Sequence, residues 1–253
     1  MGRRLISLVL LGWLALAWPA CAQGGAFANW SAVIVAGDWH AHSGAPSEVF
    51  DNARRDLGKA FVAAGFAPDH IRQFSAHEAD GHAGAPLNSD PDLVHDQLIA
   101  LTKAAGGGCL VYFTSHGAPE GILVGDDIWP PGVMAALVDD GCGARPTVVI
   151  VAACFSGVFV PALAGRNRMV LTAARADRAS FGCGEADRYT FFDACVLGEL
   201  PHAHDFIALG RAVQRCVARR ERALGARPPS EPQLDVGLDL RLVLPLYAFT
   251  PPP

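Results

Sequence analysis

The chain has 253 residues, of which 51% are hydrophobic and 18% are charged. These proportions exclude a disordered tail, a collagen and a small toxin held together by disulfides. The formal net charge is −5 and no block of like charge occurs, so we expect no nucleic-acid partner. The length provides enough surface to bury a large core, in one α/β domain or in two small ones.

The first 22 residues are typical of an export signal. Two arginines precede an apolar run over residues 5–18, and the small residues that a signal peptidase requires follow at 20–22. We therefore predict a signal peptide over residues 1–22, one domain over 23–253 and a periplasmic or secreted product. Attachment of a lipid at Cys21 is a minor alternative. The run is short for a bilayer span and no later run is longer, so we expect no integral membrane segment in the mature chain.

Export changes the interpretation of the cysteines. The cysteines that follow the predicted cleavage site are Cys109, Cys142, Cys154, Cys183, Cys195 and Cys216. An even number in an oxidising compartment permits three disulfides. If one of them is a reactive thiol instead, at least one other cysteine is unpaired. The number of cysteines leaves both arrangements open, and it leaves the pairing open.

The predicted elements alternate between strands and helices along the chain. Apolar runs predict strands at 31–36, 71–74, 109–114, 147–153 and 169–174, and amphipathic spacing predicts helices at 48–64, 91–105, 132–140 and 205–224. Residues 77–88 are typical of a surface loop, 121–129 of a small hairpin or loop, and 227–232 of a linker. Alternating leucines over 234–244 predict a late, half-covered strand. This order indicates an α/β fold with a mostly parallel sheet of about six strands and helices on both faces.

Chemistry in such sheets gathers beyond the carboxyl ends of the strands. His116 follows one apolar strand, and Cys154 follows the next strand 38 residues later. This separation allows a crossover with a short helix, so the two side chains could meet at one edge of the sheet. A thiol beside an imidazole is an activated nucleophile. The backbone N–H groups of Gly117 and of Cys154 itself could stabilise the oxyanion that the attack produces.

Each of these residues also has a structural interpretation. A cysteine after an apolar strand is usually a small buried hydrophobic residue, and a single histidine is more often a hydrogen-bonded structural residue than a base. Their joint arrangement favours catalysis, because a glycine directly follows His116 and Gly157 lies three residues after Cys154. Small residues there would let the backbone approach a substrate closely.

The two strand ends resemble a known family. The blocks LVYFTSHGAP over residues 110–119 and VIVAACFSG over 149–157 are similar to those of the legumain family of cysteine peptidases, which has a caspase-like fold. Similarity extends to the opening AVIVAG at 32–37 and to residues 171–183, which resemble the segment lining the family's substrate cleft. The resemblance covers roughly residues 30–193. It implies a caspase-like three-layer sandwich and a peptide or protein substrate, without a cofactor.

The resemblance also implies roles for single residues. Cys154 matches the nucleophile, His116 the general base, and Gly117 the residue whose N–H group helps to form the oxyanion hole. Relatives orient the histidine with a polar residue at the end of the first strand, usually asparagine. Asp38 could take that role here, although its register differs by one residue.

The substrate pocket departs from the family pattern. Legumain has a glutamate two residues before its cysteine, and this chain has Ala152 there. Cleavage after asparagine is therefore not predicted. Ser180, Asp187 and Asp193 are candidate pocket residues, and a role as surface groups would produce the same pattern. Some relatives transfer the acyl group to an amine instead of water, and the sequence does not separate the two reactions because both use one thioester.

Other functional classes compete with a cysteine endopeptidase. Asp38, His40 and His42 have the His-x-His spacing of some zinc hydrolases, and His202 with His204 could add ligands. Against this, barrel hydrolases need eight strands, and later strand ends add no further histidine except His116. A non-catalytic exported binding module on the same fold is another alternative. A thiol–disulfide oxidoreductase is disfavoured because no Cys-x-x-Cys motif occurs.

Overall fold

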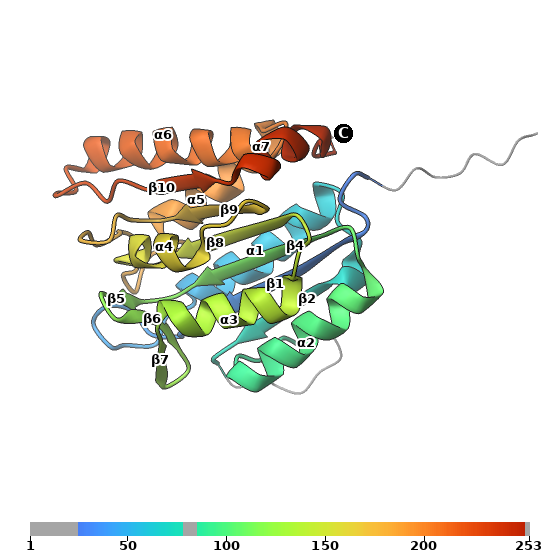
Figure 1. The fold of residues 1–253 in the computed structure, drawn as a ribbon. Helices are drawn as coiled ribbons and strands as arrows, with labels where there is room; N and C mark the ends of the chain where they lie inside the picture. The colour runs from blue at the N-terminus through green and yellow to red at the C-terminus, as the bar shows by residue number, and fades with distance from the viewer. Residues whose placement is uncertain (1–24, 78–84, 251–253) are drawn as a thin grey trace, which may run out of the picture.

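A mostly parallel sheet forms the centre of the computed structural model, which describes residues 25–77 and 85–250. Within that part, seven strands lie in the order β10-β9-β8-β4-β1-β2-β3 (Figure 1). Their bounds are β1 Trp30–Ala36, β2 Ile71–Ser75, β3 Leu87–Asn88, β4 Gly108–Thr114, β8 Thr147–Ala152, β9 Arg168–Thr172 and β10 Gln233–Val236. Only β10 is antiparallel to its neighbour, β9. The α/β class and the mostly parallel sheet predicted from the sequence are confirmed.

The central strands β1, β4 and β8 are buried along their whole length. They are continuous apolar runs because both faces of a parallel sheet are covered by helices. Their register aligns Ala36 with Thr114 and Thr114 with Ala152. The chain therefore leaves all three strands at the same edge.

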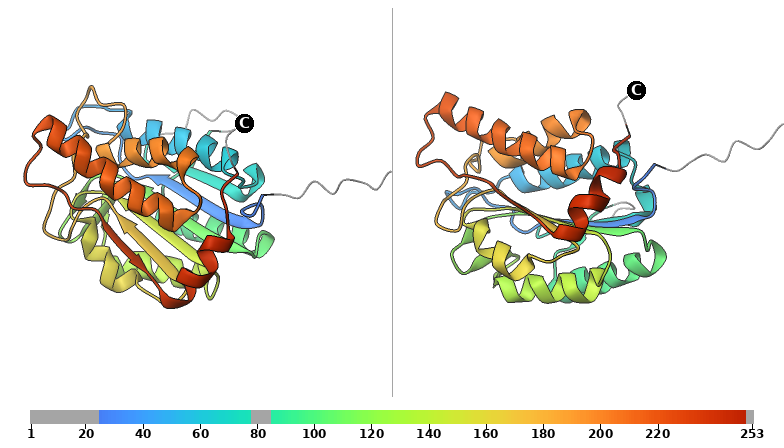
Figure 2. Two further views of the ribbon diagram at one scale, coloured as in Figure 1. Left: turned by 90° about the horizontal axis from the view of Figure 1, so that it is seen from above. Right: turned by 45° about the horizontal axis from the view of Figure 1, so that its top comes forward.

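Helices cover both faces of the sheet (Figure 2). The bounds are α1 Val49–Ala63, α2 Pro91–Ala104, α3 Pro131–Cys142, α4 Val160–Leu163, α5 Phe191–Glu199 and α6 Phe206–Leu224, with 3-10 helices η1 Pro68–His70, η2 Ser156–Phe159, η3 Leu200–His202 and η4 Leu244–Leu246. One core cluster contains residues of α1, α5 and α6, and the other contains residues of α2, α3 and α4. The three layers of the expected sandwich follow from this division. No helix in the described part is long and apolar enough to cross a bilayer.

Helix starts agree with the sequence signals. The Asp90 side chain accepts a hydrogen bond from the N–H group of Leu93 at 3.0 Å and caps α2, with Pro91 as the first helical residue. Asp205 caps α6 in the same way, through the N–H group of Ala208 at 2.8 Å. Helices α4 and α5 were not predicted, because both segments are too short to show a clear period.

The prediction of one strand over 234–244 is wrong in its second half. Strand β10 ends at Val236, and α7 (Leu238–Val243) follows. Leu240 and Leu244 are 1% and 0% exposed, whereas Leu238 and Leu242 are 63% and 79% exposed. Leucines at every second position place pairs four residues apart on one helix face, so the pattern fits a helix whose other leucine pair faces outward.

The segment after His116 forms a small separate sheet. Strands β5 (Gly117–Ala118), β6 (Gly121–Val124) and β7 (Asp127–Trp129) pair antiparallel. This confirms the hairpin expected at 121–129. The predicted signal peptide and most of the expected loop at 77–88 lie outside the described residues, and the end of that loop forms β3.

Two disulfides are present in the described part of the chain. Cys109–Cys142 joins β4 to α3, and Cys195–Cys216 joins α5 to α6. Cys154 and Cys183 are thiols. The structure thus assigns the pairing that the sequence left open.

Replacing both members of the Cys109–Cys142 pair with serine should lower the free energy of unfolding by about 2–4 kcal/mol, because the bridge closes a long loop in the unfolded chain. The two cysteines are separated by 33 positions in the sequence. Urea unfolding followed by circular dichroism measures the change. Serine at the unpaired Cys183 controls for the loss of a buried sulfur, and an unchanged urea midpoint in the double variant would contradict the prediction.

Candidate active site

Cys154 lies in the sharp turn that follows β8. Its Sγ accepts a hydrogen bond from the N–H group of Ser180 at 3.2 Å, and the side chain is partly exposed. Phe155 has a φ of 57°, in the left-handed region that side chains rarely adopt. At Gly157, a Cβ atom would overlap the backbone nitrogen of Ala176. This tight turn holds the thiol at the carboxyl edge of the sheet.

The His116 ring is fixed by one hydrogen bond and one aromatic contact. Its Nε2 lies 3.1 Å from the carbonyl oxygen of His40. A carbonyl can only accept, so Nε2 carries the proton and Nδ1 keeps a free lone pair. The ring of Phe50 packs edge-on against it, with centroids 5.0 Å apart. A neutral imidazole in this tautomer can act as a base through Nδ1.

The segments that carry Cys154 and His116 are in direct contact. Strands β4 and β8 are neighbours, and the N–H group of Ser115 donates to the carbonyl oxygen of Ala152 at 3.1 Å. A Cβ atom at Gly117 would overlap the carbonyl oxygen of Cys154. Glycine is therefore required here for a close backbone approach, as the sequence suggested.

Two backbone N–H groups, those of Gly117 and Cys154, are available where the two strand-end segments meet. Gly117 and Ile122 form the non-hydrogen-bonded kind of antiparallel pair, since Leu123 donates to the carbonyl oxygen of His116 across it. The N–H group of Gly117 is thus unused by the β5–β6 ladder. The N–H group of Cys154 has no acceptor among the described residues. Such free donors are suited to a developing oxyanion.

Asp38 organises the turn after β1. Its Oδ1 accepts hydrogen bonds from the N–H group of Trp39 at 2.7 Å and of His40 at 3.2 Å, and it lies 2.8 Å from His40 Nδ1. Its Oδ2 lies 3.9 Å from Nε2 of His116, beyond hydrogen-bond range. The hydrogen-bond partner of His116 is the carbonyl group of His40, which sequence reasoning missed because a backbone group leaves no residue signal. Asp38 holds that carbonyl in place and adds a nearby negative charge.

Two of the histidines of the zinc alternative have an imidazole nitrogen bonded to a neighbouring aspartate, His40 to Asp38 and His204 to Asp205. The backbone N–H group of His42 donates to the carbonyl oxygen of Cys183. His204 contacts Phe249 through its backbone, in the aromatic cluster that includes Phe27. Within residues 25–77 and 85–250, no three His, Cys, Asp or Glu side chains are grouped to hold a metal ion.

The candidate pocket residues fall in different environments. Ser180 contacts the thiol of Cys154. Asp193 is fully buried at the start of α5, and its carboxylate accepts hydrogen bonds from the hydroxyls of Tyr112 at 2.7 Å, Thr114 at 2.7 Å and Thr190 at 2.9 Å. Burial raises the pKa of Asp193, and the three hydroxyl bonds oppose that rise.

Two further positions complete the pocket candidates. Ala152 is 2% exposed and lies beside Thr114 in the sheet. Asp187 is half-buried and accepts a hydrogen bond from the N–H group of Gly184 at 2.8 Å. Asp193 therefore ties α5 to the end of β4 near Ala152, whereas Asp187 shapes a surface turn.

Cys183 is a second thiol close to the first. Its side chain packs against a cluster of Ala36, Val49 and Phe50. Burial, followed by the charge of Cys154, raises the pKa of the Cys183 thiol to about 11. It is therefore a packing residue that is protonated near neutral pH, and its unpaired state could not be read from the number of cysteines.

These observations define a caspase-like α/β protein, in which a cysteine and a histidine follow neighbouring parallel strands. The crystal structure of caspase-1 from Spodoptera frugiperda is similar, with a TM-score of 0.61 over 84% of this chain and 88% of that chain. At 15% identity this likeness shows the fold alone. The model of the Peptidase C13 family matches residues 92–200, which include His116 and Cys154. A search of curated protein sequences finds no match.

Residues 92–200 thus resemble the legumain-like C13 family and the fold is caspase-like, in agreement with the resemblance of the strand-end motifs. Family and fold together support a cysteine peptidase. The matched segment begins in α2 and ends in η3, so it spans both strand ends at the site.

Iodoacetamide at pH 8 should modify Cys154 and spare Cys183. A thiol with a pKa of about 11 is ionised in only about one molecule in a thousand at that pH, and the thiolate is the reactive form. Peptide mass spectrometry of the folded chain measures the two sites separately. Equal rates of modification would contradict the packing role of Cys183.

Asp193→Ala should lower the free energy of unfolding by about 3–5 kcal/mol, because it leaves three buried hydroxyls without their acceptor. Asp193→Asn keeps the volume but turns an N–H donor toward the hydroxyls, and we expect a loss of about 1–3 kcal/mol. Urea unfolding at pH 7 measures both. An asparagine variant as stable as the parent would show that the carboxylate is not needed.

Proposed function

We propose that this chain is an exported cysteine endopeptidase that cleaves peptide bonds through Cys154 and His116. The observation that carries the proposal is that Cys154 and His116 follow the neighbouring parallel strands β8 and β4, whose ends are in backbone contact. The Nε2 atom of His116 is bonded to a carbonyl group, and the N–H groups of Gly117 and Cys154 are unused in the described structure. The match of residues 92–200 to the C13 family model supports the same chemistry.

The proposed reaction begins with proton transfer from the Cys154 thiol to Nδ1 of His116. The sulfur attacks the substrate carbonyl carbon, and the oxyanion that forms accepts hydrogen bonds from the N–H groups of Gly117 and Cys154. When the C–N bond breaks, the imidazolium gives its proton to the leaving amine and a thioester remains. Water, activated by the same histidine, hydrolyses the thioester, and an amine in place of water would give acyl transfer.

Asp38 contributes to these reaction steps through its charge and its position. Its carboxylate lies 3.9 Å from the His116 ring, so it stabilises the imidazolium that forms when the thiol is deprotonated. It also fixes the turn whose carbonyl group sets the tautomer of His116. We assign Asp38 as a positioning residue.

The specificity we propose excludes asparagine before the cut. Ala152 replaces the glutamate that legumain has two residues before its cysteine, and the nearby Asp193 carboxylate is already bonded to three hydroxyls. Ser180 lies at the thiol and would line the pocket.

The proposed periplasmic or secreted location rests on the predicted export signal over residues 1–22, and two disulfides suit an oxidising compartment.

A fluorogenic peptide library varied at the residue before the cut tests the proposal. The mature chain should cleave some members, and Cys154→Ala or His116→Ala should each lower kcat/KM by at least about 1,000-fold. His95→Ala is the matched control, because His95 lies on α2 and pairs with Asp140.

Three outcomes would contradict this function. Full activity in a folded Cys154→Ala variant would exclude the thiol mechanism. Loss of activity to a chelator without sensitivity to alkylation would support a metal hydrolase. Absence of turnover in every library member, with normal folding, would favour a binding module on the same fold.

A further inference from the structure

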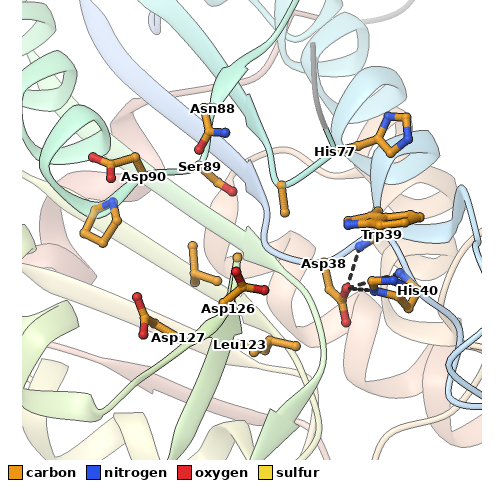
Figure 3. Close-up of a pocket in the computed structure, with 14 residues that line it drawn as sticks. Asp38, Trp39, His40, His77, Asn88, Ser89, Asp90, Leu123, Asp126 and Asp127 are labelled. Atoms are coloured by element: carbon orange, nitrogen blue, oxygen red, sulfur yellow. Dashed lines mark hydrogen bonds and ion pairs between the residues drawn. The ribbon is translucent and has the colours of Figure 1, made fainter.

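A cavity lies at the carboxyl edge of the sheet, on the side of His116 that faces away from Cys154. It has a volume of about 740 Å³ and lies between the ends of β2 and β3 on one side and the β6–β7 turn on the other (Figure 3). Asp38, His40 and Leu123 line this cavity and also a smaller hollow of about 510 Å³ that reaches His116 and Gly117. The cavity therefore adjoins the candidate active site.

The lining of the cavity is acidic. Among residues 25–77 and 85–250, those that line it include Asp38, Asp90, Asp126 and Asp127 and no lysine or arginine. The carboxylates of Asp38 and Asp90 accept backbone N–H hydrogen bonds, whereas Asp126 and Asp127 are exposed in the β6–β7 turn without an ion pair in the described structure. Carboxylates of one sign around a concave surface attract a cation.

An unpartnered buried hydroxyl points to a ligand in the same place. Ser89 is 2% exposed, and its Oγ has no hydrogen-bond partner among the described residues. Its side chain is turned toward the cavity (Figure 3). Buried hydroxyls almost always have a partner, so this one indicates a group that the cavity receives.

Aromatic side chains on one side of the cavity indicate which kind of cation it would bind. The indole of Trp39 lies against the ring of His40, with centroids 3.9 Å apart and the planes tilted by 37°, and the ring of His77 lies edge-on at 5.3 Å. Ammonium and guanidinium groups bind favourably to such rings. The carboxylates are spread around the walls, and no group of described side chains has metal-ligand geometry. An organic cation fits this arrangement better than a metal ion.

The strand order places the cavity relative to the scissile bond. Along the edge, Cys154 follows β8, His116 follows β4, Asp38 follows β1, and Ser89 follows β3 at the far side. His116 therefore stands between the nucleophile and the cavity. Because the histidine protonates the leaving amine, the cavity lies on the leaving-group side.

Three strand spacings separate β4 from β3, or about 14 Å, which an extended peptide covers in about four residues. We propose that this cavity is a subsite for a lysine or arginine side chain located two to four residues after the scissile bond. The assignment of the side rests on the proposed function, whereas the preference for a cation rests on the cavity alone.

The test uses peptides that all carry, before the scissile bond, the residue that the peptide library shows to be cleaved fastest. They differ only in having lysine or glutamate at the second to fourth positions after that bond. The parent chain should show a kcat/KM at least about 10-fold higher for the lysine peptide. Asp126→Asn with Asp127→Asn should reduce that ratio about 5- to 10-fold, because two exposed charges are removed. Asp69→Asn, an exposed aspartate on η1, is the matched control and should leave the ratio unchanged.

Ser89→Ala adds a second, independent variant. Since its hydroxyl has no partner among the described residues, the alanine should unfold at the same temperature as the parent. It should nevertheless lower kcat/KM for the lysine peptide by about 3- to 10-fold, the effect of one lost ordinary hydrogen bond. An unchanged rate with lysine would contradict a role of Ser89 in the subsite.

A binding measurement separates failure of this proposal from failure of the peptidase. Fluorescence anisotropy with Cys154→Ala and the same labelled peptides gives their Kd values without cleavage. If no variant cleaves but the lysine peptide binds more tightly in a manner that depends on Asp126 and Asp127, the cation subsite stands and the peptidase fails. Equal Kd and equal kcat/KM for lysine and glutamate would overturn the subsite.

Discussion

The alignment of three parallel strand ends is the constraint on which the site depends. Strands β1, β4 and β8 are buried on both faces, so their register is fixed by packing, and Ala36, Thr114 and Ala152 lie in one row. A slip of one residue would turn every side chain to the opposite face. The residues that follow these strands are therefore held by the core, although they lie in turns. Catalytic groups on such turns are positioned without rigid side-chain networks of their own.

Close backbone packing then fixes the distance between the turns that follow the aligned strands. Gly117 lies against the carbonyl oxygen of Cys154, and Gly157 against the backbone after β9. Both contacts exclude a Cβ atom, so they bring the His116 and Cys154 segments nearer than other residues would allow. The N–H groups of Gly117 and Cys154 remain available because the chain geometry leaves them outside any ladder. The oxyanion site that we propose would thus be a product of backbone shape.

The sequence predicted the elements whose period was long and consistent, such as β4, β8 and α6. It also located the two strand-end motifs, because parallel strands must end at one edge. It could not show that the carbonyl of His40 holds His116, since every residue type has a carbonyl. The leucines of α7 were misassigned because alternation also places pairs four residues apart. The cavity at Ser89 was invisible because β3 and the β6–β7 turn meet only after folding, and they lie 38 positions apart in the chain.

Asp38 links the reaction centre to the acidic cavity. Its carboxylate lines the cavity and also lies 3.9 Å from the His116 ring. A cation bound in the cavity would share that negative charge with the imidazolium and would weaken its stabilisation. The proton of His116 would then pass more readily to the leaving amine, which is the step that needs an acid. A basic residue after the scissile bond would therefore add to binding and also favour departure of the segment that carries it.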